Sequence, residues 1–95
     1  MSTETITPVT GTVIDKETNE PIKSAIVWLF AFLGASEGTT RTHKDGSFSI
    51  TPSLPSPFYS LKILAPGYRT FRIQQIDPSV DSLNLGTLKM EKAPS

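Results

Sequence analysis

The chain has 95 residues, and its nine Lys and Arg balance nine Asp and Glu, so the formal net charge is zero at pH 7. This length suits one small domain with a thin core. The balanced charge argues against a nucleic-acid binder and against a polybasic membrane-docking protein, because both need excess positive charge. The absence of cysteine excludes disulfides, iron–sulfur clusters and Cys-ligated zinc, and one histidine is too few for a His-rich metal site. We expect no metal and no cofactor.

The sequence predicts no membrane insertion. Its longest apolar run, residues 26–33, is eight residues, far short of the roughly 18–20 that span a bilayer as a helix. The N-terminal residues lack the basic start and apolar centre of a signal peptide. We therefore expect that the chain stays inside the cell, leaves it by another route, or is a piece of a longer protein.

Short segments rich in Thr, Val, Ile, Phe and Tyr alternate with turn residues, which include eight Pro and six Gly. This pattern is typical of β-sandwiches, and no long segment free of Pro and Gly shows helical periodicity. Strands are predicted at residues 7–15, 24–33, 39–43, 47–51, 58–65, 68–76 and 83–90. We expect an all-β, seven-stranded antiparallel Greek-key sandwich over residues 7–90, with an N-terminal tail at 1–6 and a C-terminal tail at 91–95.

Glycines mark the expected turns and one irregularity. Asp45-Gly46 predicts a hairpin turn of type I′, in which both central residues have positive φ. Pro66-Gly67 fits a type II turn, in which only the glycine has positive φ. In the last strand Gly86 separates two apolar pairs of opposite parity, and we expect a β-bulge there.

Polar residues give no catalytic or metal-binding pattern. His43 is the only histidine, and imidazole is a common general base, but neither a Ser-x-Gly elbow nor a Cys nucleophile accompanies it, so we interpret it as a polar residue beside a turn. Residues 15–20 carry oxygen-bearing side chains at alternate positions, like the start of a calcium loop. Glu20 and Ile26 stand where an EF-hand loop needs Gly and Glu. A solvated turn is the preferred interpretation.

The second predicted strand is apolar on both faces. Ala25, Val27, Leu29, Ala31 and Leu33 share one face, and the other face carries Ile26, Trp28, Phe30 and Phe32. Because side chains alternate, one register of a two-layer sandwich buries only one of these sets. An exposed aromatic stripe marks a partner-binding surface. The alternatives are that the loop at residues 52–57 covers the stripe, that a bulge turns some of it inward, or that Trp28 stacks against a sugar.

Several segments together resemble a known family. Gly11-Thr-Val-Ile-Asp15, Pro21-Ile22 and Ala25-Ile-Val-Trp-Leu29 are similar to the opening of a carboxypeptidase regulatory-like domain. Asp45-Gly-Ser-Phe-Ser-Ile50 resembles the central hairpin of that family, and Ala65-Pro-Gly-Tyr68 resembles its third block. The resemblance extends over nearly the whole chain, from about residue 7 to 90.

The resemblance implies a transthyretin-like sandwich that is not an enzyme and that serves as a folding, spacing or docking module of surface or extracellular proteins. It favours an extracellular, cell-surface or virion location. Transthyretin-fold enzymes that hydrolyse 5-hydroxyisourate need a histidine in the first strand and a C-terminal Tyr-Arg-Gly-Ser. This chain has Thr10-Gly-Thr12 and Lys92-Ala-Pro-Ser95 at the corresponding places, so we exclude that activity.

The sequence thus predicts a non-catalytic structural or docking module that acts in a surface or virion-type assembly. Its partner is expected to be a protein or a second copy of the chain, bound through Ile26, Trp28, Phe30 and Phe32. A carbohydrate-binding or adhesion module is the alternative function. Unprotected edge strands offer a further route, the addition of a partner strand.

Overall fold

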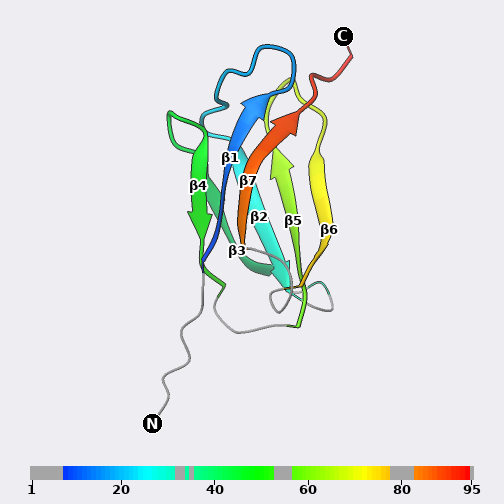
Figure 1. The fold of residues 1–95 in the computed structure, drawn as a ribbon. Coiled ribbons are helices and arrows are strands. Elements are labelled where there is room, and N and C mark those ends of the chain that lie inside the picture. Colours follow the sequence, from blue (N-terminus) through cyan, green and yellow to red (C-terminus); the bar gives the residue numbers. More distant parts are fainter. Residues whose placement is uncertain (1–7, 32–33, 35, 53–56, 78–82, 95) are drawn as a thin grey trace.

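The computed structural model describes residues 8–31, 34, 36–52, 57–77 and 83–94. All the regular elements in this part of the chain are strands apart from a single 3-10 residue at Gly34, which confirms the all-β prediction (Figure 1). The seven strands, in chain order, are β1 (Val9–Asp15), β2 (Ile26–Ala31), β3 (Ser36–Arg41), β4 (Ser47–Ile50), β5 (Tyr59–Leu64), β6 (Phe71–Ile76) and β7 (Asn84–Met90).

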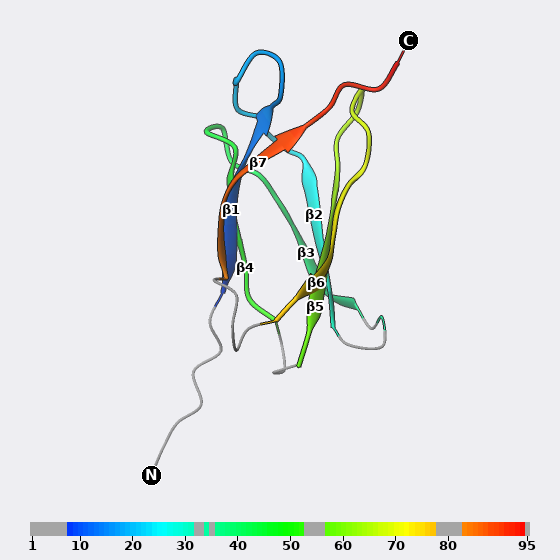
Figure 2. The same cartoon turned by 45° about the vertical axis from the view of Figure 1, so that its right-hand side comes forward.

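The strands form two sheets that face one another (Figure 2). One sheet has the order β4-β1-β7, and the other has the order β3-β2-β5-β6. Alternate residues of every strand except β3 point between the sheets, where they form one hydrophobic core. Its largest fully buried side chains are Val9, Val13, Val27, Leu29, Leu61, Ile63 and Met90.

One strand pair departs from the antiparallel prediction. The pairs β1/β4, β2/β3, β2/β5 and β5/β6 are antiparallel, whereas β1 and β7 run in parallel. Figure 1 shows the arrows of β1 and β7 side by side and pointing the same way. The parallel pair arises because the chain leaves β6 in one sheet and enters β7 in the other, beside the first strand. The transthyretin-like Greek-key description of the connections stays a prediction.

The bulge predicted at Gly86 is confirmed. Thr10 of β1 pairs with Asn84 and Thr12 pairs with Thr87, so β7 has one residue more than β1 between these pairs. Gly86 has φ of 71°, a conformation that glycine adopts without a steric penalty. The extra residue reverses the alternation of inward and outward side chains at this point. Both apolar pairs of the strand therefore face the core: Leu83, Leu85, Leu88 and Met90.

The turn before β4 differs from the predicted type I′. Among its residues only Gly46 has positive φ, and Asp45 does not. The amide of Gly46 donates to the carbonyl of His43 at 2.9 Å, and the amide of His43 donates to the carbonyl of Ser47 at 2.8 Å. This is a three-residue loop in which a type I turn is followed by a left-handed glycine. The turn at Gly67 has the predicted positive φ, 83°, and the amide of Tyr68 closes it on the carbonyl of Ala65.

Candidate functional site

The outer face of β2 holds the apolar stripe that the sequence predicted. Val27 and Leu29 point into the core and are fully buried, whereas Ile26, Trp28 and Phe30 are only partly buried on the opposite face. This alternation confirms the predicted parity of the strand. Phe32, the fourth predicted residue of the stripe, lies outside the described residues.

Trp28 and Phe30 form one aromatic surface. Their ring centroids are 5.0 Å apart and their planes are inclined by 27°, a stacked arrangement. The indole Nε1 of Trp28 donates a hydrogen bond of 2.8 Å to Oγ of Ser36 on β3, which fixes the ring against the sheet. The rings are therefore held in place while they remain partly exposed.

For the described residues of the stripe, Ile26, Trp28 and Phe30, the predicted alternative of a bulge that turns them inward is wrong. The pairing of β2 with β3 does shift between Leu29 and Phe30. On the other side, however, β2 pairs with β5 in unbroken register, with Trp28 opposite Lys62 and Phe30 opposite Ser60. Both rings keep their outward direction because the extra residue of this irregularity lies in β3 and not in β2. The alternative of cover by the loop at 52–57 falls largely on residues 53–56, outside the described residues.

Two neighbours on β5 extend this surface beyond the prediction. Leu64 pairs with Ile26 and is partly exposed, so it continues the apolar stripe onto β5. Lys62 lies between Trp28 on β2 and Arg72 on β6 in the same cross-strand row. Tyr59, Leu61 and Ile63 of β5 face the core, and this alternation is the available sequence signal for the outward direction of Lys62 and Leu64. We call the outer surface formed by Ile26, Trp28, Phe30 and Leu64 the aromatic face.

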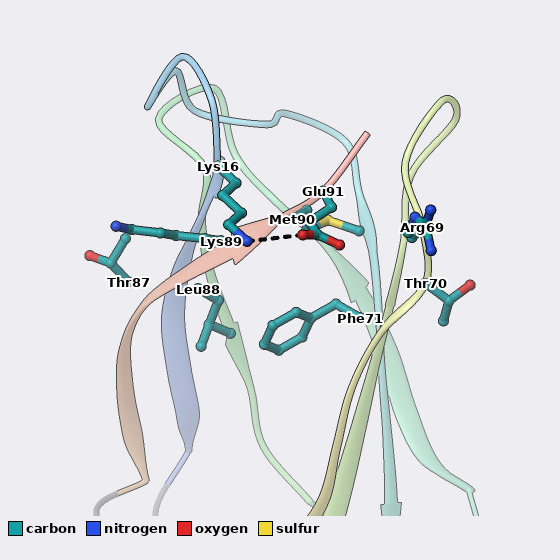
Figure 3. A pocket seen from close by; sticks show the side chains of 9 residues that line it. All are labelled: Lys16, Arg69, Thr70, Phe71, Thr87, Leu88, Lys89, Met90 and Glu91. Carbon is teal, nitrogen blue, oxygen red and sulfur yellow. Dashed lines mark hydrogen bonds and ion pairs between the residues drawn. The ribbon is translucent and has the colours of Figure 1, made fainter. Parts of the chain in front are cut away.

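A second apolar opening lies at one side of the sandwich, between the edge strands β6 and β7. A pocket of about 560 Å³ there is lined by Phe71, Leu88 and Met90, and by the charged residues Lys16, Arg69, Lys89 and Glu91. Figure 3 shows Phe71 and Leu88 pointing toward one another between the sheets, with the ion pair of Lys16 and Glu91 above them. The chain after β7 bridges to the segment before β6 at this end, where the amide of Arg69 donates to the carbonyl of Glu91 at 2.8 Å.

Sequence reasoning missed a buried polar cluster at the same end of the molecule. Asp15, expected in a solvated turn, is only 3% exposed. Its Oδ2 accepts a hydrogen bond of 2.6 Å from the Tyr68 hydroxyl and lies 3.7 Å from the Lys92 ammonium. Its Oδ1 accepts the amides of Glu17 and Thr18 at 2.7 and 3.1 Å. Asp15 shares the parity of Val9 and Val13, and that was the available signal for its inward direction.

These contacts shift both titrating groups of the cluster. The hydrogen bond from Tyr68 lowers the pKa of Asp15, against the opposing effect of burial, and the two amides and Lys92 lower it further. The same hydrogen bond raises the pKa of Tyr68, because it favours the protonated phenol, and burial adds to the effect. The cluster joins the end of β1 to the β5–β6 turn and to the segment after β7, so its role is to fix the fold.

Other candidate sites gain no support. His43 is exposed beside the hairpin turn, as the sequence predicted. Within the described ranges, no group of three or more His, Asp or Glu side chains is placed to hold a metal ion. Nor does any helix in those ranges have the length and apolar character needed to cross a membrane.

Known structures share this architecture. The chain is similar to the pilus 2b backbone protein of group B streptococcus, with 20% identity and a TM-score of 0.62 over 93% of this chain and 42% of that one. It is similar to the shaft pilin SpaA of Lactobacillus rhamnosus GG, with 11% identity and a TM-score of 0.65 over 97% of this chain and 49% of that one. It also resembles 3-chlorocatechol 1,2-dioxygenase of Rhodococcus opacus 1CP, with 13% identity and a TM-score of 0.66 over 93% of this chain and 60% of that one.

At these identities the likeness shows the fold alone, and the chain spans 16% to 60% of the length of such structures. No curated protein matches it in sequence. The model of one protein family, the carboxypeptidase regulatory-like domain, matches residues 8–90. This match covers all seven strands and both sheets, and the chain therefore belongs to the carboxypeptidase regulatory-like domain family.

Proposed function

We propose that the chain is a non-catalytic docking module that binds another protein, or a second copy of itself, through the aromatic face. The observation that carries the proposal is the contrast along β2. Its inward residues are fully buried, while the stacked rings of Trp28 and Phe30 remain partly exposed on the outside. Aromatic side chains dominate the centres of protein interfaces because they bury large areas with little loss of conformational freedom.

The comparisons support the same class of function. The similar structures include two pilus subunits and a chain from a complex described as a type II cohesin–X-dockerin complex of Acetivibrio cellulolyticus. Two of them are named as pilus subunits, and the third is named as part of a complex between proteins. We extend that role to this chain as part of a surface or virion-type assembly. The dioxygenase likeness concerns the sandwich, and the described residues supply no catalytic arrangement on which to base an enzyme.

Binding assays with two variants of the aromatic face test the proposal. Trp28→Ala and Phe30→Ser should remain folded and lose co-purifying protein, self-association in sedimentation, or both. Thr87→Ala is the matched control, because Thr87 is exposed on the outer face of the opposite sheet. The proposal is wrong if the unmutated chain is monomeric at high concentration and retains no partner, or if the control loses binding to the same extent.

A carbohydrate-binding or adhesion function is the second candidate, and one observation favours it. A hollow of about 330 Å³ beside the aromatic face is lined by Phe30 together with polar side chains, which include Ser60, Lys62, Arg72 and Gln74. Sugar sites combine an aromatic platform with such convergent polar groups. Trp28 is the only tryptophan of the chain, so a change in its fluorescence on addition of neutral polysaccharide would support this candidate, and unchanged fluorescence would exclude it.

A further inference from the structure

The row of side chains that crosses the aromatic face contains an electrostatic conflict. Lys62 on β5 and Arg72 on β6 are register partners, and both point to the outer face of the sheet beside Trp28. Like charges placed directly opposite on neighbouring strands destabilise a sheet. Neither cation forms an ion pair with another described residue. The fold therefore keeps two adjacent, uncompensated positive charges next to its exposed rings.

The three strands β2, β5 and β6 carry no carboxylate, and the only acidic residue in the four strands of this sheet is Glu37 on the edge strand β3. The outward positions of β2, β5 and β6 are occupied by Ile26, Trp28, Phe30, Ser60, Lys62, Leu64, Arg72 and Gln74. None of them is a carboxylate, although the whole chain has as many acidic as basic residues. A cation on the edge strand β6 protects that edge from unwanted pairing, but this role needs no second cation on β5. The pair is explained if a binding partner supplies the counter-charge.

We propose that the partner of the aromatic face is an acidic protein segment, which places a carboxylate between Lys62 and Arg72 and an apolar side chain against Trp28 and Phe30. This inference rests on the proposed function and specifies the chemistry of the partner. The hollow lined by Phe30, Lys62 and Arg72 provides a place for the carboxylate beside the rings. Arg41, which pairs with Ile26 from β3, adds a third positive charge at the edge of the same face.

A protein segment fits this surface better than a sugar does. The apolar residues continue from Phe30 to Ile26 along β2 and onto Leu64 of β5, a stripe about 13 Å long at the usual rise per strand residue. Aliphatic side chains at one end of the stripe offer a sugar neither a stacking platform nor a hydrogen bond. They do match the alternating apolar side chains of a polypeptide. An acidic glycan is therefore an outcome of the test rather than the proposal.

Fluorescence titration of the full chain tests the inference, since Trp28 reports on the site directly. The probes are two random copolymers of equal length, poly(Glu,Tyr) and poly(Lys,Tyr), together with oligogalacturonate as the acidic sugar. We expect poly(Glu,Tyr) to bind at least about tenfold more tightly than poly(Lys,Tyr), and to lose affinity as salt rises. The double variant Lys62→Glu, Arg72→Glu should raise the Kd for poly(Glu,Tyr) by at least about tenfold.

The control is Lys89→Glu, a charge reversal at an exposed position of β7 in the opposite sheet. A second readout separates binding from stability. The single variant Arg72→Gln should weaken poly(Glu,Tyr) binding and at the same time raise the urea midpoint of unfolding, because it relieves the like-charge pair. Equal binding of both copolymers, equal effects of the double variant and the control, or binding of oligogalacturonate alone would each overturn the inference.

The proposed function fails in a distinguishable way. If Phe30→Ser abolishes binding of both copolymers while the charge variants bind like the unmutated chain, the aromatic face is a docking surface without a preference for acidic partners. If Phe30→Ser has no effect on any probe or on retained protein partners, the docking function itself is contradicted.

Discussion

The hydroxyl of Tyr68 donates a hydrogen bond of 2.6 Å to Oδ2 of Asp15, 53 residues earlier in the chain. The bond connects the end of β1 in one sheet with the β5–β6 turn of the other. The Asp15 carboxylate also holds its own turn through the amides of Glu17 and Thr18. One buried side chain therefore fixes both a local turn and the approach of the two sheets at this end of the sandwich.

Removal of the phenolic hydroxyl should destabilise the fold. Tyr68→Phe deletes the bond to Asp15 and leaves a carboxylate oxygen with only the more distant Lys92. A hydrogen bond to a charged group contributes about 1.5–3 kcal/mol, and we expect the free energy of unfolding to fall by about that amount in urea titrations. Thr70→Ala, at an exposed position before β6, is the control. A Tyr68→Phe variant as stable as the control would show that the bond contributes nothing.

Stability should also fall in acid, in the range where Asp15 takes up a proton. The pKa of Asp15 is lowered from the ordinary value of 3.8, first of all by the Tyr68 hydroxyl. A lowered folded-state pKa stabilises the protein above the unfolded value, and this stabilisation is lost as the pH falls through the folded-state value. Urea titrations from pH 7 downward should show an acid loss beginning near pH 4, and Asp15→Asn should reduce it. If the free energy of unfolding falls as much in acid for Asp15→Asn as for the unmutated chain, this assignment is wrong.

Gly46 should tolerate no side chain. It has φ of 81°, and a Cβ there would clash with the carbonyl oxygen of Val13 and lie 3.2 Å from Cβ of Pro21. Gly67, with φ of 83°, is the matched control, because a Cβ there meets no atom within 4 Å. Both Ala variants carry the conformational penalty of about 1–3 kcal/mol. We expect Gly46→Ala to be clearly less stable than Gly67→Ala in thermal unfolding; equal losses would contradict the close contact.

Adjacent residues of β2 should respond differently to truncation. Leu29 is fully buried in the core, and Leu29→Ala should lower the free energy of unfolding by about 2–5 kcal/mol. Phe30 points outward and is only partly buried, so Phe30→Ala should lower it by less than half as much despite the larger group removed. Equal or reversed losses of stability in urea titrations would show that the inward and outward faces of β2 have been assigned wrongly.

Strand parity was the part of the structure that the sequence predicted best. Alternation along β2 correctly placed Val27 and Leu29 inward and Ile26, Trp28 and Phe30 outward, and the parity change at Gly86 located the bulge. These features depend on the order of apolar and polar residues within a few positions. A few neighbouring positions of the sequence therefore contain all the information that is needed to predict them.

The features that were missed depend on contacts between distant segments. The parallel pairing of β1 with β7 follows from where the chain crosses between sheets, which residue alternation within β7 does not specify. Asp15 was interpreted as a turn residue because its partner Tyr68 lies far along the chain. The like-charged pair of Lys62 and Arg72 required the register of β5 and β6. In each case a local pattern lacks the information that cross-strand register supplies.

Site-specific photo-crosslinking tests the docking account most directly. The full chain would carry p-benzoylphenylalanine in place of Phe30 on the aromatic face or, in a second variant, in place of Thr87 on the outer face of the opposite sheet, and would be irradiated in the organism that encodes it. We predict protein adducts from position 30 and few from position 87. Adducts from position 87 alone, or equal yields from the two positions, would contradict a partner-binding role for the outer side of β2.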